Sequence, residues 1–93
     1  MSRSVSFVTG AAQGIGRGIA LRLARDGFDV AVNDLPSKAA LLEELVREIK
    51  GINGRRSIAL CGDVSSDQDV SSMIEKVVAE LGSLNVVGPR PTF

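Results

Sequence analysis

The sequence predicts an α/β protein built on a parallel β-sheet. Short apolar runs alternate with amphipathic helical patterns along the 93 residues, and this alternation is typical of strand–helix–strand units. The apolar runs are nearly continuous, as expected for strands that helices cover on both faces. Each run is followed by a glycine or an aspartate, so turn residues recur at the same end of the predicted strands. We therefore expect three layers, with the sheet in the middle.

The first strand is predicted at residues 5–9 and the first helix at residues 14–26. Gly27 supplies a C-terminal stop for this helix. Its apolar residues recur every fourth position, which places them on one face. The expected buried face consists of Ile15, Ile19 and Leu23.

The second strand is predicted at residues 28–33 and the second helix at residues 38–50. Leu35-Pro36 breaks the chain between them, and Ser37 is the expected N-cap of the helix. The buried stripe of this helix is expected to contain Leu41, Leu45 and Ile49, widened by Leu42 and Val46.

The third strand is predicted at residues 56–61, and Ser66 or Asp67 caps a helical pattern that ends at Gly82. A fourth strand begins near residue 84. Right-handed crossovers then give the sheet order 3-2-1-4. Residues 88–93 contain two prolines and are expected to form an extended, disordered tail. The core face of the third helix is expected to consist of Val70, Ile74, Val77 and Leu81.

Composition narrows the classes of function. Eleven basic and eleven acidic residues cancel, so we expect neither nucleic acid nor an anionic membrane as a partner. The chain has no histidine, which excludes imidazole bases and histidine-bound metal sites. Cys61 is the only cysteine, and its apolar run predicts a buried side chain rather than a nucleophile. No targeting signal is visible, so the cytoplasm is the default location.

Glycines are concentrated between the first strand and the first helix. A glycine costs about 1 kcal/mol relative to alanine inside a helix, so several of them near a helix start must serve another purpose. Without Cβ atoms, Gly10 can turn sharply, Gly14 can let a ligand touch the main chain, and Gly16 can let the helix approach the strand. The N–H groups around Gly14 and Ile15 would then face an anion such as a pyrophosphate.

Two aspartates are expected at the same edge of the sheet as the glycines. Asp34 follows the second strand, about 20 residues after Gly14, where a carboxylate can accept hydrogen bonds from ribose hydroxyls and repel a 2′-phosphate. Asp63 follows the third strand. Each has a purely structural alternative, since Asp34 can cap the next element and Asp63 can form an Asx-turn or cap the next helix.

These residues carry a family resemblance. Thr9-Gly10-Ala11-Ala12-Gln13-Gly14-Ile15-Gly16 resembles the cofactor-binding signature of the short-chain dehydrogenase/reductase family, whose members use NAD or NADP in one Rossmann-like domain. Asp34 matches the position where NAD-preferring members carry an acid, and Gly62-Asp63-Val64 resembles the family's Asp-Val pair at the adenine ring. The resemblance implies a Rossmann-like fold and NAD as cofactor, with NADP less favoured. It also implies these cofactor-binding residues: Gly10, Gln13, Gly14, Ile15, Gly16, Asp34, Asp63 and Val64.

The resemblance covers Ser4 to about Val86, so it implies that residues 1–87 form the N-terminal part of an NAD(P)-binding domain. Family members are typically more than twice as long, and their catalytic Ser, Tyr and Lys belong to the part beyond. This chain contains no tyrosine, so no residue matches the family's proton-transferring group. We therefore expect a cofactor-binding half without catalytic residues.

Two kinds of function remain open. The first is the NAD-binding portion of a family oxidoreductase, and the second is a non-enzymatic binding or regulatory fragment. The fragment would associate with itself or with a relative through an exposed sheet edge. A Rossmann-like methyltransferase is a weaker alternative, because its glycines are usually spaced Gly-x-Gly-x-Gly.

Overall fold

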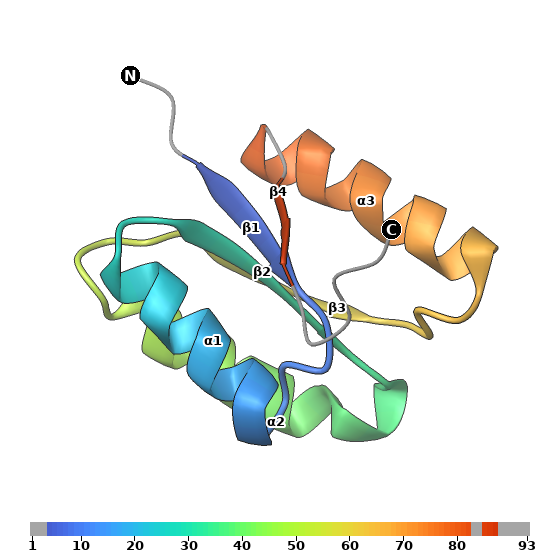
Figure 1. Cartoon of the computed structure of the whole chain (residues 1–93), viewed down its shortest axis with the longest axis horizontal. Coiled ribbons are helices and arrows are strands. Elements are labelled where there is room, and N and C mark those ends of the chain that lie inside the picture. Colours follow the sequence, from blue (N-terminus) through green and yellow to red (C-terminus); the bar gives the residue numbers. More distant parts are fainter. Residues whose placement is uncertain (1–3, 83–84, 88–93) are drawn as a thin grey trace.

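The structure is a computed structural model that describes residues 4–82 and 85–87 (Figure 1). It contains strands β1 Val5–Val8, β2 Asp29–Asp34, β3 Ser57–Cys61 and β4 Asn85–Val87, helices α1 Gly14–Arg25, α2 Ala39–Lys50 and α3 Asp67–Leu81, and one 3₁₀ turn, η1 Pro36–Lys38. Strands and helices alternate as the sequence predicts. The predicted tail at residues 88–93 lies outside the described residues.

The four strands form one parallel sheet in the order β3-β2-β1-β4. In register, Val5 of β1 faces Asp29 of β2, and Val30 of β2 faces Ser57 of β3. Because all the strands run in one direction, their carboxyl ends meet at a single edge. The predicted α/β class with a parallel sheet is confirmed.

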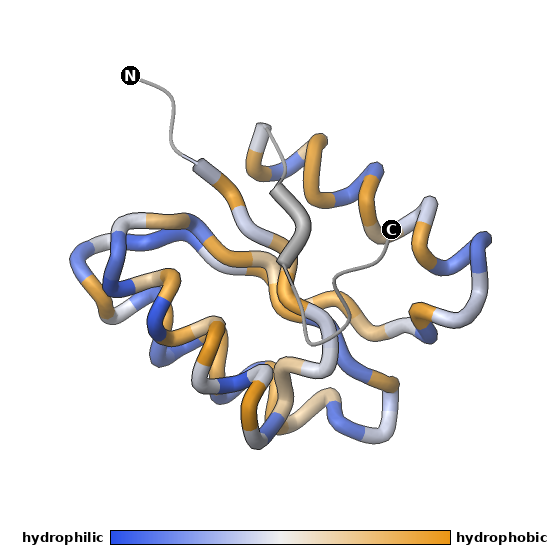
Figure 2. Tube along the Cα trace, viewed as in Figure 1, coloured by the Kyte–Doolittle hydropathy of each residue, from blue (hydrophilic) through white to orange (hydrophobic). Residues whose placement is uncertain are grey.

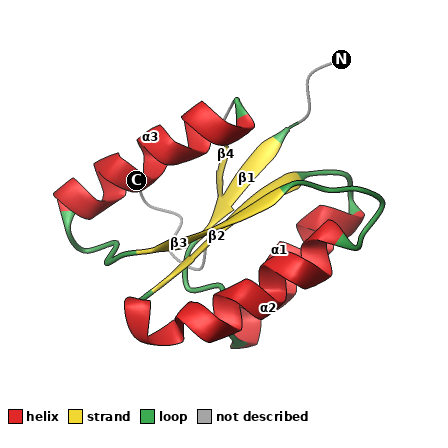
Figure 3. Cartoon of the chain, turned by 180° about the vertical axis from the view of Figure 1, so that it is seen from behind, coloured by secondary structure: helices red, strands yellow, loops and turns green. Residues whose placement is uncertain are grey.

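Helices cover both faces of the sheet, so the fold has three layers (Figures 1 and 3). Helices α1 and α2 pack against Val8, Val30 and Val32 on one face, and α3 packs against Phe7 and Ala31 on the other. Figure 2 shows the consequence in the hydropathy of the trace, with apolar strands in the middle and helices of mixed hydropathy on either side. The core is divided by the sheet into two apolar clusters.

The start of α2 differs from the prediction. Pro36 opens the 3₁₀ turn η1, which contains Ser37, so the N-cap position of α2 falls on Lys38 and no side chain caps the helix. The buried stripe of α2 consists of Leu42, Leu45, Val46 and Ile49. The prediction that Leu41 belongs to this stripe is wrong: its side chain is 37% exposed, because α2 turns positions 42, 45, 46 and 49 toward the sheet.

Helix α3 begins and ends at the predicted residues. The Ser66 hydroxyl accepts a hydrogen bond from the Asp69 N–H (3.3 Å), and Gly82 ends the helix with a left-handed φ of 87°. Val77 and Leu81 are buried as expected, while Val70 and Ile74 are partly buried. Met73 completes the buried face, although the sequence analysis did not include it.

Cys61 is exposed, so the prediction of a buried cysteine is wrong. It is the last residue of β3, which lies at one end of the sheet order. Neighbouring Leu60 points into the core and is buried. Successive side chains of a strand point to opposite faces, and the face that receives Cys61 is not covered at this point.

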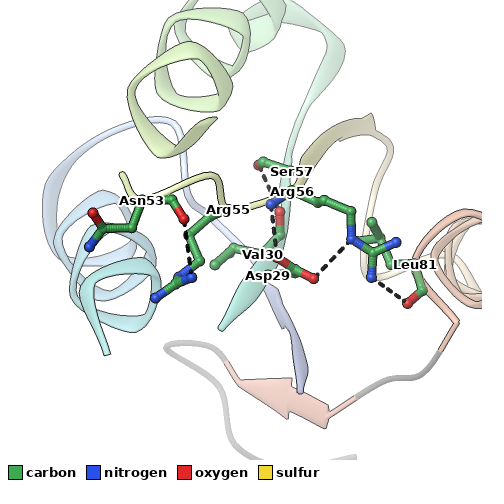
Figure 4. Close-up of polar contacts among 7 residues, drawn as sticks. All are labelled: Asp29, Val30, Asn53, Arg55, Arg56, Ser57 and Leu81. Atoms are coloured by element: carbon green, nitrogen blue, oxygen red, sulfur yellow. Dashed lines mark hydrogen bonds and ion pairs between the residues drawn. The ribbon is translucent and has the colours of Figure 1, made fainter. Parts of the chain in front are cut away.

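A buried carboxylate joins three elements at the amino-terminal edge of the sheet (Figure 4). Asp29 is fully buried and accepts hydrogen bonds from the N–H (2.8 Å) and from the guanidinium Nε (3.0 Å) of Arg56. The same guanidinium donates to the Leu81 carbonyl at the end of α3 (3.2 Å). The loop before β3, the start of β2 and the end of α3 are therefore held together at the edge opposite the predicted site.

We expect Asp29→Asn to lower the free energy of unfolding by about 1 to 3 kcal/mol, because charge-assisted hydrogen bonds to Arg56 are weakened in a buried position. Urea denaturation measures the change. The matched control is Asp26→Asn, which removes the exposed ion pair with Arg22 (3.3 Å) and should cost less than about 0.5 kcal/mol. Equal losses in the two variants would contradict the structural role of Asp29.

Candidate functional site

Three loops meet at the carboxyl ends of β1, β2 and β3. The Ala11 N–H, in the turn after β1, donates to the Asn33 carbonyl of β2 (2.8 Å). On the other side, the Gly62 N–H after β3 donates to the Asp34 carbonyl (3.1 Å). The structure therefore brings the predicted glycine turn, the acid after β2 and the loop after β3 to one edge, with the end of β2 in the centre.

The turn between β1 and α1 requires glycine for two separate reasons. Gly10 and Gly14 have φ angles of 62° and 65°, a left-handed conformation that other residues adopt at a cost. At Gly16 the reason is space, since a Cβ atom would overlap the Gly10 carbonyl oxygen and lie 3.2 Å from the Ala11 Cα. The helix can therefore begin directly against the end of β1.

The start of α1 is open toward solvent and lacks a side-chain cap. Gln13 occupies the N-cap position in an extended conformation without a side-chain hydrogen bond to the helix, and the first turn contains no acid. A Cβ atom at Gly14 would meet nothing within 4 Å. An open backbone with uncapped N–H groups at the positive end of a helix dipole fits an anionic group such as a diphosphate.

Ile15 lies at this opening rather than in the core. Its side chain is 79% exposed, so the prediction that it belongs to the buried face of α1 is wrong. The buried residues of α1 are Gly16, Ala20 and Ala24, and Ile19 and Leu23 are partly buried. The close approach at Gly16 rotates the helix so that small residues face the sheet and Ile15 faces outward.

Asp34 contacts the glycine turn through its side chain. Its Oδ2 accepts a hydrogen bond from the Ala12 N–H (3.1 Å), and its Oδ1 accepts one from the Leu35 N–H (2.8 Å). The following turn η1 has no side-chain cap, so the carboxylate does not take the alternative capping role. A carboxylate has about four lone-pair directions, so it can accept further hydrogen bonds from a ligand.

Asp63 forms a local turn in the loop after β3. Its Oδ1 accepts hydrogen bonds from the N–H (2.8 Å) and from the hydroxyl (2.7 Å) of Ser65, which is the Asx-turn given above as its structural alternative. These two hydrogen bonds hold the pKa of the Asp63 carboxyl below its ordinary value, and the bond from the Ser65 hydroxyl has the larger effect. The side chain is exposed, while Val64 beside it packs against the α3 cluster. Asp63 is therefore a charged acceptor with a fixed orientation.

Two residues at this edge are not among those predicted from the sequence. Lys38 places its Nζ 3.4 Å from the Gln13 Oε1, so the turn η1 contacts the glycine turn through side chains. Asn33 is buried and reaches the loop after β3. Lys38 gave no signal, because it occupies the start of an ordinary amphipathic helix pattern. Asn33 did give one: a polar amide follows the apolar run Val30-Ala31-Val32 directly before Asp34.

A surface cavity of about 390 Å³ lies elsewhere, between α1 and α2. It is lined by Arg17, Glu44, Arg47 and Glu48, and Arg17 forms an ion pair with Glu48 across it. None of the predicted site residues lines this cavity.

The described residues contain no helix long and apolar enough to cross a membrane and no group of three metal-ligating side chains of the His, Cys, Asp or Glu type.

The sequence profile of the family described as short chain dehydrogenase matches residues 4–88. The chain belongs to this family. It is 49% identical over 88 residues to the short-chain dehydrogenase/reductase eriH of Hericium erinaceus, a match that covers 92% of this chain and 34% of eriH. The chain thus spans about a third of the length of the curated relatives it matches.

Solved structures of the family share the fold of the chain. A blue fluorescent protein from a metagenomic library, in complex with NADPH, is 33% identical with a TM-score of 0.84, over 91% of this chain and 35% of that protein. A 3-ketoacyl-(acyl-carrier-protein) reductase from Brucella melitensis, complexed with NADH, is 29% identical with a TM-score of 0.78, over 91% and 33% respectively. Both forms of the nicotinamide dinucleotide therefore occur among the structural neighbours.

We expect Gly16→Ala to destabilise the chain by about 1 to 3 kcal/mol or more, because the new methyl group meets backbone atoms that cannot move aside cheaply. Gly18→Ala is the matched control. It lies in the same helix, meets nothing within 4 Å, and should stabilise the chain by about 0.5 to 1 kcal/mol through helix propensity. Urea denaturation of both variants measures the two effects. A neutral Gly16→Ala variant would show that α1 does not need this close approach.

We expect Ser65→Ala to raise the pKa of Asp63 toward its ordinary value, because the hydroxyl is the larger cause of the lowering. A lowered folded-state pKa contributes stability above the unfolded-state pKa, and that stability is lost as the pH falls through the folded-state pKa. The stability difference between the two proteins should therefore vanish at acid pH. Carboxyl NMR titration measures the pKa, with Ser71→Ala on α3 as control. An unchanged midpoint would contradict the hydrogen bond from the Ser65 hydroxyl to the Asp63 carboxylate.

Proposed function

We propose that this chain binds the adenosine diphosphate part of NAD and is the N-terminal, cofactor-binding portion of an NAD(P)-dependent oxidoreductase. The observation that carries the proposal is the open glycine turn, where α1 starts without a cap and a Cβ at Gly14 would meet only open space. Main-chain N–H groups there would hold the diphosphate. In this proposal residues 1–87 belong to the cofactor-binding domain.

The two acids would recognise the adenosine. Asp34 stands beside the glycine turn, so its carboxylate would accept hydrogen bonds from the ribose hydroxyls. Asp63 and Val64, at the end of the neighbouring strand, would contact the adenine ring, with the Asp63 carboxylate as acceptor for the exocyclic amine. The full set of proposed cofactor contacts consists of Gly10, Gln13, Gly14, Ile15, Gly16, Asp34, Asp63 and Val64.

NAD rather than NADP is the proposed ligand, because the negative charge of Asp34 would repel a 2′-phosphate. Lys38 contacts Gln13 close by, and its charge would offset part of that repulsion. We therefore propose that the chain prefers NAD and still binds NADP more weakly. We also propose that this chain by itself does not perform the proton transfer that accompanies hydride transfer, and the lack of tyrosine in the sequence supports this proposal.

We expect calorimetric titration to show NAD binding about tenfold or more tighter than NADP, a difference of about 1.4 kcal/mol. Asp34→Asn should narrow this ratio, because it removes the charge and keeps one side-chain oxygen as acceptor. Asp34→Ala should weaken the binding of both NAD and NADP, because the Ala12 N–H also loses its hydrogen-bond acceptor.

The matched control for the loss of charge is Asp67→Asn, an exposed acid in the first turn of α3, which should leave the ratio unchanged. Equal affinity of the unmodified chain for NAD and NADP would overturn the role of Asp34. Absence of binding of either dinucleotide at millimolar concentration to a folded sample would overturn the proposed function itself.

A further inference from the structure

Asn33 is a buried polar side chain at the point where the site is assembled. It is 2% exposed, although asparagine is disfavoured in strands. Its amide Nδ2 donates to the Leu60 carbonyl (3.0 Å) and to the Gly62 carbonyl (3.2 Å), and it also lies 3.2 Å from the Met73 Sδ. One side chain thus joins the end of β3, the loop after it, and α3.

The backbone of Asn33 contacts the opposite loop. Its carbonyl accepts the hydrogen bond from the Ala11 N–H in the glycine turn (2.8 Å). The next residue repeats this pattern in reverse, since the Asp34 side chain binds Ala12 and the Asp34 carbonyl binds Gly62. Because successive side chains of a strand point to opposite faces, this pair of residues links two loops that lie on different sides of the sheet.

The chemistry at this position requires a donor of the size of asparagine. Carbonyl oxygens only accept hydrogen bonds, and the amide NH₂ group supplies two donors for the Leu60 and Gly62 carbonyls, with the Asp34 carbonyl farther away at 3.4 Å. A leucine, which has the same branching but is larger, would leave the Leu60 and Gly62 carbonyls without this donor, and an aspartate would place a further acceptor against them. Neither residue could make these two contacts, and the loop would then depend on its other hydrogen bonds, among them the one from the Asp63 N–H to the Asp69 Oδ2 (3.0 Å).

We propose that Asn33 is a positioning residue that fixes the loop Gly62–Val64 relative to Asp34, and so makes the site selective for a 6-amino purine. The inference rests on the proposed function. The loop carries Asp63, whose charged carboxylate accepts from an exocyclic amine only if the loop is held at the right distance from the ribose-binding acid. Asn33 touches no ligand and acts through the loop.

The first test measures the loop without any cofactor. Amide hydrogen exchange of Asn33→Leu should be accelerated tenfold or more at Gly62, Asp63 and Ser65 relative to the unmodified chain. Ser57→Ala is the matched control, since the buried Ser57 hydroxyl donates to the Val30 carbonyl (2.7 Å) across the same strand pair, at its other end (Figure 4). Any acceleration of amide hydrogen exchange in Ser57→Ala should not be concentrated in the loop after β3. Equal exchange patterns in the two variants would overturn the proposal.

The second test measures selectivity with two probes, NAD and nicotinamide hypoxanthine dinucleotide, which carries an oxygen in place of the 6-amino group. The unmodified chain and Ser57→Ala should bind NAD tenfold or more tighter than the hypoxanthine dinucleotide. In Asn33→Leu the dissociation constants of the two dinucleotides should differ by no more than about threefold. A preserved preference in Asn33→Leu would overturn the proposal. If Asn33→Leu does not fold, Asn33→Ser takes its place. It retains one donor, so its preference for NAD should fall below that of Ser57→Ala, and an equal preference would overturn the proposal.

The two tests separate the two hypotheses. If the folded, unmodified chain binds neither dinucleotide, the proposed function fails and the recognition part of this inference fails with it. Amide hydrogen exchange in the loop then still shows whether Asn33 positions residues 62–64.

Discussion

The contact between the start of α1 and the end of β1 sets the geometry on which the other features depend. No Cβ atom fits at Gly16 against the Gly10 carbonyl, so the helix lies as close to the strand as two backbones allow. This closeness places the first uncapped N–H groups of α1 directly at the carboxyl edge of the sheet. It also explains why the sheet-facing residues of α1 are small, with Ala20 and Ala24 where other helices carry leucine.

The end of β2 provides the second constraint. Two consecutive residues, Asn33 and Asp34, bind the glycine turn on one side and the loop after β3 on the other. In a parallel sheet the connecting loops are not joined to one another by the sheet ladder, so their relative positions depend on such added contacts. A short polar pair at a strand end is therefore enough to turn three independent loops into one surface.

Much of this architecture could be predicted from the sequence because it depends on local signals. Periodicity defined the strands and helices, and positive φ or lack of space explains the glycines that the pattern singled out. The errors concern residues at the ends of elements. Leu41 and Ile15 belong to regular apolar patterns, yet their helices turn other positions toward the sheet. Cys61 ends an apolar run, yet it is the last residue of an outer strand and is exposed there. Coverage depends on tertiary contacts that periodicity does not contain.

The distribution of charge at the carboxyl edge connects the geometry to its proposed ligand. The uncapped N–H groups lie at the start of α1, after β1, and the two carboxylates lie to one side of them, at the ends of β2 and β3. A ligand that matches this order carries negative charge at the N–H groups and hydrogen-bond donors to one side of that charge. A diphosphate joined to an adenosine has this order, since its hydroxyls and exocyclic amine are donors. A simple anion would match the helix start but would be repelled by Asp34 and Asp63, so the acids favour an extended ligand over an isolated phosphate.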